Sequence, residues 1–265
     1  MRHAKRERFP IMMSMLVIGV VASLILISQS LRASADQELH MHVLGSAVKQ
    51  QSRPSAKEEF EKIKAQYPKV DYDSPEPTDP AERMKRHNKG KHFDNGYISK
   101  KPTRYSSVLS SHWDVGLSAL PVEQSSAVLL ASTVSRGAFL SNDRSGVYTE
   151  LSVRVEQVLK GDYDQLSENC IVDINRVGGV VHYSSGEESL FSIEGQNIPV
   201  VGKRYLFFLK AIPDSVDFEI ITGYELSASR VKALDSPAQF AQFDGLDEMT
   251  FLTTVRNAIA QKKQQ

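Results

Sequence analysis

The residues of this chain that could form a nucleophile–base pair lie around His182. Ser184 and Ser185 follow it by two and three residues, and the acidic Glu187 and Glu188 come soon after. Residues two apart in a strand face the same side, so Ser184 and His182 could pair for acyl transfer. A solvated hairpin histidine is the simpler interpretation, since the chain has no Gly-x-Ser-x-Gly motif to present a nucleophilic serine. We therefore predict no catalytic residue and keep a hydrolase centred on His182 as the alternative.

Two groups of carboxylates fall in segments that the sequence predicts to be turns. Asp162 and Asp164 form the first group, and Asp214, Asp217 and Glu219 form the second. Carboxylate oxygens bind hard cations, but neither group matches the Asp-x-[Asp/Asn]-x-[Asp/Asn]-Gly pattern of a calcium loop. Because loops lie at the surface, we expect these carboxylates to be solvated.

The other histidines considered as metal ligands lie in polar sequence between residues 40 and 112. They are His40, His42, His87, His92 and His112, with Asp94 close to the last three. No two of them have the i,i+4 spacing and supporting carboxylate of a His-Glu-x-x-His site. Gly178 and Gly179 lack the strand-to-helix context of a phosphate loop, and no Walker or Gly-x-Gly-x-x-Gly motif is present. The sequence predicts no metal site and no cofactor.

Two further features have both a structural and a chemical interpretation. Cys170 is the single cysteine, so the chain has no disulfide framework, and its alternation with Val172 and Ile174 indicates a small buried hydrophobe rather than a reactive thiol. Lys203 and Arg204 follow the tight turn of Pro-Val-Val-Gly and could contact an anion. We expect this turn mainly to lead the chain into a buried strand.

The elements that would position these residues are mostly short strands. Residues 147–155 alternate between apolar and polar types, which predicts a strand with one dry face. The alternation slips at Gln157 and Val158, where we expect a bulge and a bend. Further strands are predicted at residues 127–134, 171–176, 180–183, 190–193, 205–209, 218–222 and 229–234. Residues 205–209 are apolar at every position, which indicates a strand covered on both faces.

Together these strands predict a mainly β domain over residues 113–260. The expected architecture is a small antiparallel barrel or sandwich, followed by an amphipathic helix at residues 247–261 that buries Phe251, Leu252, Val255 and Ile259. The bend in the long strand favours the barrel.

The formal net charge is zero only as a sum over two unlike halves. Residues 1–112 carry 19 Lys and Arg against 12 Asp and Glu, whereas the remaining residues carry 13 against 20. Phosphate contacts are made mainly by Lys and Arg, so the acidic half argues against nucleic-acid binding.

The N-terminus has the pattern of a membrane address. Residues 1–10 form a basic tail, and residues 11–28 form a transmembrane anchor or a signal peptide. Because basic residues cluster before the apolar segment, the tail is expected in the cytoplasm and the rest of the chain outside it, periplasmic or at the cell surface. Cleavage after Ala35 would make the protein secreted, whereas the length of the apolar run favours an uncleaved anchor.

Residues 29–112 are predicted to be a polar, largely disordered stalk. A short helix is expected near residues 56–67, because Ser55 and Glu58 form a capping box and Pro68 ends the pattern. Residues 83–104 are strongly basic. We interpret them as a solvated tether, with contacts to anionic lipid, to a cell-wall polymer or to the acidic domain itself as the alternatives.

The motifs VYTE, VRVEQVLKG, NRVGG, SSGE, GQNIPVVGKRYLFFL and TGYEL, all within residues 115–260, resemble a family of uncharacterised bacterial secreted or membrane-anchored proteins. The strand that ends in Val-Leu-Lys-Gly is also similar to early strands of netrin-like domains and metalloproteinase inhibitors, which are OB-type barrels. That similarity implies a fold alone, because this chain lacks the N-terminal cysteine and the disulfides of those inhibitors.

We therefore expect a binding or structural module, tethered to the membrane through residues 11–28 and displayed outside the cytoplasm. Its partner would be a protein or an envelope polymer and not a nucleic acid. The alternative is an envelope hydrolase with a site around His182.

Overall fold

The protein is described from a computed structural model, which describes residues 56–96, 98, 107–109, 113–161, 163–213 and 215–262. The chain divides into two compact units, residues 1–53 and residues 54–265, and every described residue belongs to the second. The basic tail at 1–10, the anchor at 11–28 and the cleavage position after Ala35 lie outside the described residues. In the described part of the chain, no helix is both long enough and apolar enough to cross a bilayer.

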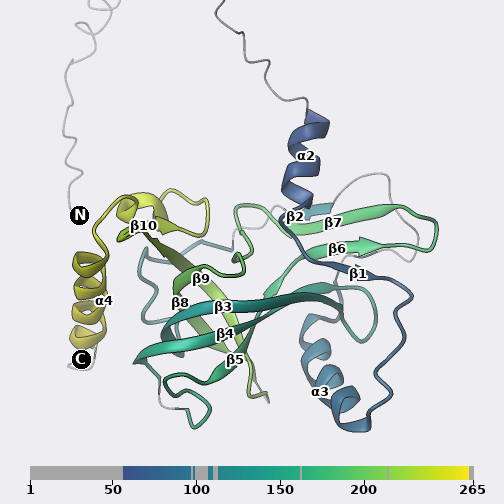
Figure 1. Cartoon of the computed structure of the whole chain (residues 1–265), viewed down its shortest axis with the longest axis horizontal. Coiled ribbons are helices and arrows are strands. Elements are labelled where there is room, and N and C mark those ends of the chain that lie inside the picture. Colours follow the sequence, from purple (N-terminus) through teal and green to yellow (C-terminus); the bar gives the residue numbers. More distant parts are fainter. Residues whose placement is uncertain are drawn as a thin grey trace, which may run out of the picture. The chain divides into compact units, whose positions relative to one another are not determined.

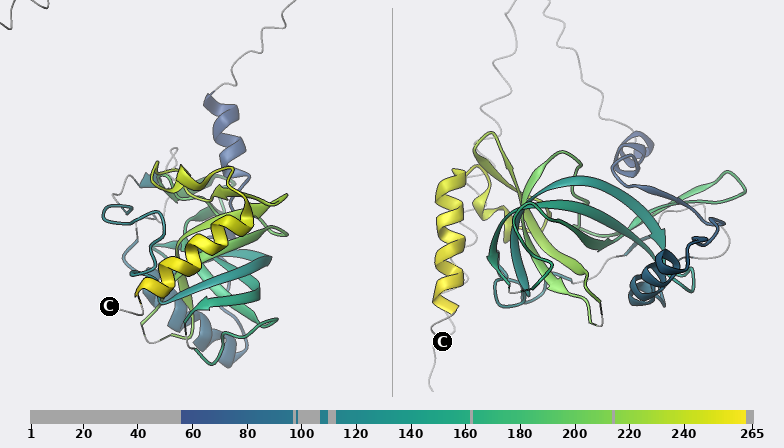
Figure 2. Two further views of the ribbon diagram at one scale, coloured as in Figure 1. Left: turned by 90° about the vertical axis from the view of Figure 1, so that its left-hand side faces the viewer. Right: turned by 60° about the horizontal axis from the view of Figure 1, so that its bottom comes forward.

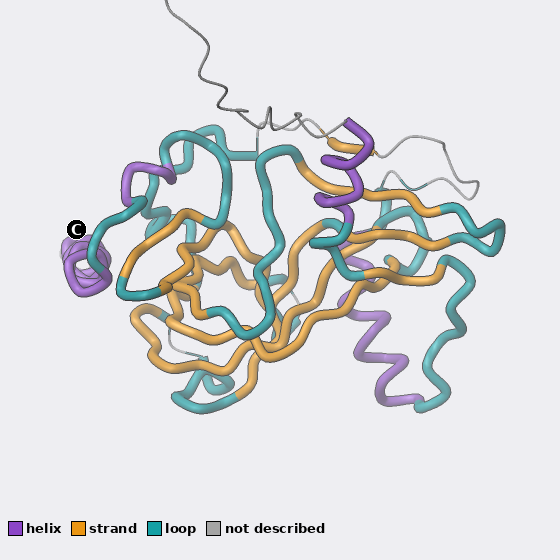
Figure 3. Tube along the Cα trace, turned by 45° about the horizontal axis from the view of Figure 1, so that its top comes forward, coloured by secondary structure: helices purple, strands orange, loops and turns teal. Residues whose placement is uncertain are grey.

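The domain is mainly β, as predicted, and its largest element is a six-stranded sheet (Figure 1). Its strands are β3 (Ala127–Leu140), β4 (Val147–Lys160), β5 (Ile171–Val177), β8 (Arg204–Ala211), β9 (Phe218–Ser227) and β10 (Arg230–Ala233). Their order is β10-β9-β5-β4-β3-β8, and β8 also pairs with β9. The strands therefore curl round on themselves (Figure 3).

This curled sheet is not a closed barrel. β9 pairs with β8 in antiparallel register along most of its length, but it meets β5 through only two parallel residue pairs, Ile174 with Phe218 and Asn175 with Glu219. The prediction of a small barrel or sandwich is thus confirmed only as a mainly β domain with a C-terminal helix. The parallel pairing also departs from the expected all-antiparallel arrangement.

The bend expected in the long strand is present. The β3–β4 register shifts between Val128 and Leu129 and again between Leu130 and Ala131, on both sides of the pairings made by Gln157 and Val158. Each shift inserts an extra residue in β4, and such bulges increase strand twist and let a sheet curl.

A second sheet is built around the hairpin of β6 (Gly179–His182) and β7 (Glu188–Ile193). The short strands β1 (Lys69–Asp71) and β2 (Ser107–Leu109) add to it in parallel, giving the order β1-β6-β7-β2. β1 and β2 come before the large sheet in the sequence. The β6–β7 hairpin that they flank comes later, between β5 and β8.

The described residues form a small third cluster at the β6–β7 hairpin and two main core layers, one inside the curled sheet and another between the sheet and the C-terminal helix. Alternate residues of β8 serve the two layers: Tyr205, Phe207 and Leu209 face one, and Leu206 and Phe208 face the other. All five are at most 1% exposed, which confirms a strand covered on both faces.

The C-terminal helix α4 (Glu248–Lys262) follows a short 3-10 turn, η2 (Phe240–Phe243). It lies against the outer side of the curled sheet (Figure 2) and buries Phe251, Leu252, Val255 and Ile259, the four residues that the sequence assigned to its inner face.

The structure differs from the expected disordered stalk at residues 80–93. In addition to α2 (Ala56–Lys64), which falls within the range predicted for a short helix, this region contains α3 (Pro80–Gly90) and η1 (Lys91–Phe93). The side chain of Asp79 accepts hydrogen bonds from the backbone N–H groups of Ala81 and Glu82, which caps α3, and Phe93 stacks on Tyr148 of β4 with ring centroids 4.2 Å apart. Apolar periodicity did not reveal α3 because most of its contacts with the domain are ionic.

Candidate functional site: the ionic cluster beneath α3

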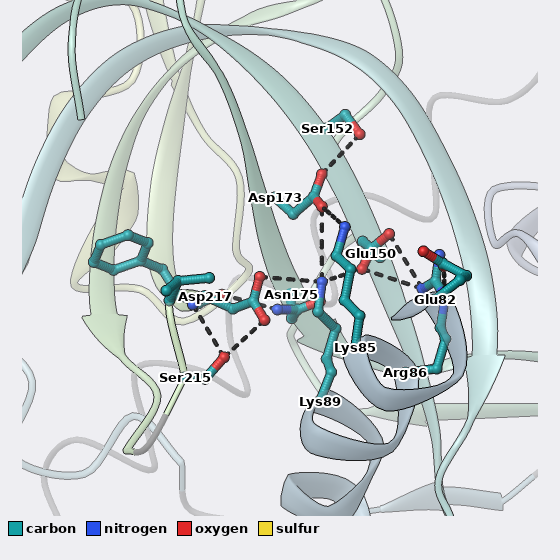
Figure 4. Close-up of polar contacts among 12 residues, drawn as sticks. Glu82, Lys85, Arg86, Lys89, Glu150, Ser152, Asp173, Asn175, Ser215 and Asp217 are labelled. Atoms are coloured by element: carbon teal, nitrogen blue, oxygen red, sulfur yellow. Dashed lines mark hydrogen bonds and ion pairs between the residues drawn. The ribbon is translucent and has the colours of Figure 1, made fainter. Parts of the chain in front are cut away.

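One face of α3 carries three basic side chains. Lys89 lies four residues after Lys85 and three after Arg86, so both lie beside it on the helix surface and all three reach the same neighbour. That neighbour is the surface formed by β4, β5 and the loop between β8 and β9, which supplies Glu150, Asp173 and Asp217 (Figure 4).

Lys89 lies at the centre of the cluster, and its side chain is 0% exposed. Its Nζ forms an ion pair with Glu150, lies 3.1 Å from Oδ1 of Asp217 and lies 3.8 Å from Oδ2 of Asp173. A buried ammonium is strongly disfavoured unless it is paired, and these carboxylates provide the pairing.

Arg86 and Lys85 extend the network toward the surface. Nη1 of Arg86 donates to both carboxylate oxygens of Glu150, at 3.2 Å each, and its Nε donates to Glu82 at 2.9 Å. Its guanidinium also lies 3.6 Å from the ring centroid of Phe139, which is a cation–π contact. Nζ of Lys85 donates to Asp173 at 3.1 Å.

Neutral side chains complete the hydrogen bonding of the carboxylates. Oγ of Ser152 donates to Asp173 at 2.9 Å, and Oγ of Ser215 donates to Asp217 at 2.8 Å. The buried amide of Asn175 donates through Nδ2 to the carbonyl of Phe218 at 3.3 Å, whereas its Oδ1 has no hydrogen-bond partner among the described residues.

The cluster changes the protonation equilibria of its members. Burial raises the pKa of Asp173, but hydrogen bonds from Lys85 and Ser152 and the charges of Lys89 and Lys85 outweigh burial and hold the pKa below its ordinary value. The hydrogen bond to Asp173 raises the pKa of Lys85 above its ordinary value, although burial opposes it. Burial also raises the pKa of Tyr148, whose ring lies beside the cluster.

The geometry of the cluster suits attachment rather than turnover. Three cations, Lys85, Arg86 and Lys89, are neutralised by Glu150, Asp173 and Asp217, and the central ammonium has no exposed surface that a substrate could reach. A reacting group needs access to a substrate and room for it. The arrangement therefore fixes α3 onto the sheet.

The segment after α3 is held by the loop between β3 and β4. The side chain of Asn142 donates to the carbonyl of His87 at 2.8 Å, and the carboxylate of Asp143 accepts from the backbone N–H of Asn95 at 2.9 Å. Gly96 and Gly146 allow the two chains to approach closely: a Cβ on Gly96 would overlap Ser145, and one on Gly146 would overlap Phe93.

The residues around His182 do not form a nucleophile–base pair. The ring of His182 is half-exposed, and its Nδ1 lies 3.8 Å from Oε1 of Glu188, which also binds Lys64 and Lys69. No hydrogen bond among the described residues joins His182 to Ser184 or Ser185. Both serines are exposed in the hairpin turn.

The predicted turn carboxylates have different environments. Asp164 is exposed, as expected, and Glu219 lies 3.5 Å from Nε2 of His92. Asp217 is only 7% exposed and pairs with Lys89, so the prediction of a solvated carboxylate is wrong for it. Asp162 and Asp214 lie outside the described residues.

The described histidines and acids do not form a metal centre. Asp94 accepts the backbone N–H of Asp143, and within the described ranges no group of three or more His, Cys, Asp or Glu could hold a metal ion. His40, His42 and His112 lie outside those ranges.

The two remaining sequence features have structural contacts. Gly178, with φ of +119°, and Gly179 join β5 to β6, so they do not precede a helix. Lys203 pairs with Glu225 at 2.9 Å, and Arg204, the first residue of β8, pairs with Glu156 and Glu248. Cys170 is partly buried against the main core, and its Sγ donates to the carbonyl of Gln165 at 3.2 Å.

Sequence reasoning did not single out Lys89, Glu150 or Asp173. Glu150 lies on the polar side of the alternation in β4, which was expected to face water but is buried beneath α3. The basic spacing of Lys85, Arg86 and Lys89 was the available signal. Residues 83–104 were predicted to be a solvated tether, and this is wrong for Lys85, Arg86 and Lys89, which contact the acidic domain, one of the alternatives given for the segment.

No protein-family model matches this chain, and no curated protein matches it at a significant level. The resemblance of residues 115–260 to bacterial secreted or membrane-anchored proteins therefore stays a prediction.

Proposed function

We propose that this protein is a membrane-tethered binding or structural module displayed outside the cytoplasm. The apolar segment at residues 11–28 and the basic residues before it support the tether and its orientation. The mainly β domain with its single partly buried cysteine is suited to either an oxidising or a reducing compartment, since its stability depends on core burial rather than on disulfides.

We propose further that the domain is an OB-type barrel. The pairings β3–β4, β4–β5, β5–β9, β9–β8 and β8–β3 support this proposal, because an OB-type domain is a five-stranded, partly open barrel. The narrow β5–β9 contact corresponds to the open part. OB-type domains bind ligands on the face of their second and third strands and on the adjoining loops.

The proposal depends most on one observation, which is that α3 occupies the face formed by the second and third strands. β4 and β5 would be the second and third strands, and α3 covers them through Lys89, Glu150 and Asp173, with Asp217 and Asn142 contributing from the adjoining loops. The face is therefore engaged by a helix from the tether side of the chain. We infer that the module uses this face to fix α3, which precedes the large sheet in the chain, so that its remaining surface is presented to a protein or an envelope polymer.

The test is crosslinking of the intact full-length protein in its envelope. We expect a discrete crosslinked complex whose yield falls several-fold in Lys89→Met, because α3 no longer fixes the domain, and is retained in Lys91→Met, which changes an exposed lysine just after α3. A panel of hydrolase substrates is assayed in parallel. Turnover that disappears in His182→Ala, without any crosslinked complex, would refute the module and support the hydrolase.

A further inference from the structure

A small open cavity lies between the last residue of β4 and the last turn of α4. Its volume is about 320 Å³, and its lining residues are Val122, Glu123, Lys160, Ile259 and Lys262. It shares no residue with the cluster beneath α3. Pockets that hold small molecules start at roughly this size, about 300 Å³.

The cavity has an apolar base. Val122 and Ile259 are 4% and 6% exposed, and both belong to the core layer between the sheet and α4. The core holds these two side chains in place, and the small part of each that stays exposed forms the apolar floor of the cavity, so a hydrocarbon group can touch it without rearranging the domain.

Three of the described residues that line the cavity are charged, and Lys160, Lys262 and Glu123 together carry one excess positive charge. Nζ of Lys160 donates to the backbone carbonyls of Val122 and Ser125, at 2.6 Å each. An ammonium group has three N–H donors, so one remains beyond these two. Lys262 forms an ion pair with Glu123, which leaves the charge of Lys160 without a carboxylate partner among the residues that line the cavity.

The environment of Lys160 also disfavours its charged form. Burial lowers its pKa below the ordinary value, the charge of Lys262 lowers it further, and Glu123 only partly compensates. An added anion at this position would therefore relieve an unfavourable interaction.

We propose that this cavity binds a small aliphatic monocarboxylate. The carboxylate contacts the ammonium groups of Lys160 and Lys262, and the hydrocarbon chain packs on Val122 and Ile259. One negative charge balances the excess positive charge of the residues that line the cavity. This inference does not depend on the tether or on the role of α3.

The experiment is isothermal titration of the full-length protein in lipid nanodiscs with hexanoate, with empty nanodiscs as the blank. We expect one binding site and weaker binding for each methylene removed from the chain, by less than the roughly fourfold that full burial of a methylene would give, because the cavity is open. Hexanol, which has the same chain without the charge, is expected to bind at least tenfold more weakly.

Two variants separate binding at this cavity from a general effect of charge. Lys262→Glu should weaken hexanoate binding at least tenfold, whereas the matched control Lys232→Glu, at an exposed position of β10, should leave it unchanged. Ile259→Trp should fill the cavity and prevent binding. Ile259 also packs in the core, so the thermal unfolding of the Ile259→Trp variant is compared with that of the wild type. Lys262→Glu changes an exposed residue and therefore tests binding without altering the core.

Three results would overturn the inference. They are the absence of hexanoate binding, equal affinity for hexanol and hexanoate, and equal weakening by Lys232→Glu and Lys262→Glu.

Discussion

Lys89 is the residue on which attachment of α3 depends most. Lys89→Met removes the central ammonium, which leaves the buried Asp217 without its ion-pair partner among the described residues and Glu150 with Arg86 alone. Breaking one partner of a buried ion pair typically costs about 3–5 kcal/mol, so we expect a loss of that order in the free energy of unfolding. Urea denaturation of the full-length protein in a non-ionic detergent measures it. Lys91→Met, at an exposed position, should change stability by less than about 0.5 kcal/mol. A loss below about 1 kcal/mol in Lys89→Met would mean that the cluster contributes little.

The lowered pKa of Asp173 predicts a specific acid sensitivity. Because its pKa is lower in the folded protein than in the unfolded chain, the Asp173 carboxylate stabilises the fold above the unfolded pKa of about 3.9. That contribution is lost as pH falls through the folded pKa. Between about pH 5 and pH 3, stability should therefore fall less steeply in Asp173→Asn than in the wild type, and the exposed Asp164→Asn should follow the wild type. Equal slopes for wild type and Asp173→Asn would contradict the assignment.

Among the elements, the β9–β10 hairpin has a turn whose residues do not suit its backbone. Ala228 and Ser229 have φ of +48° and +60°, the left-handed conformations that a two-residue hairpin turn of type I′ requires. Asn and Gly adopt these conformations at lower cost, so Ala228→Asn combined with Ser229→Gly should stabilise the protein by about 1 kcal/mol. Thermal unfolding provides the measurement. A lower unfolding temperature would show that the two side chains make contacts worth more than the backbone strain.

Gly96 and Gly146, where the segment after η1 meets the β3–β4 loop, should tolerate no side chain. Gly146→Ala places a methyl group against the carbonyl of Phe93, and overpacking of this kind typically costs about 1–3 kcal/mol. Gly137→Ala in β3 is the matched control, because its methyl group would meet only the movable ring of Phe139, at 3.2 Å. Hydrogen exchange should be faster at the backbone amide of Ile98, which bonds to Ser145, in Gly146→Ala than in Gly137→Ala. The same exchange rate in both variants would show that the contact between Gly146 and Phe93 does not hold the segment after η1 against the β3–β4 loop.

At the scale of the whole molecule, the pattern of apolar residues predicted the strands and the helix that are held by apolar contacts with the core. The unbroken apolar run at Tyr205–Leu209 and the inner face of α4 were predictable because their side chains enter the core directly. The burial of Glu150 was not, because an alternating strand does not indicate that its polar side is covered by a helix more than fifty residues earlier in the chain. The parallel β5–β9 contact was equally hidden, since strand pairing depends on chain topology and not on the composition of either strand.

The opposite charges of the two halves of the sequence acquire a physical meaning in this fold. Part of the basic half, on α3, meets part of the acidic half, on β4, β5 and the β8–β9 loop. The pairing fixes α3 to the sheet within one compact unit, residues 54–265.

The location of the domain is tested most directly by fusing alkaline phosphatase, or alternatively a fluorescent protein that matures only in the cytoplasm, after Gln265 and expressing each fusion in bacteria. We predict active phosphatase and no fluorescence, with the fusion retained in membranes after a carbonate wash. A fluorescent fusion in the soluble cytosolic fraction, with inactive phosphatase, would contradict a module displayed outside the cytoplasm.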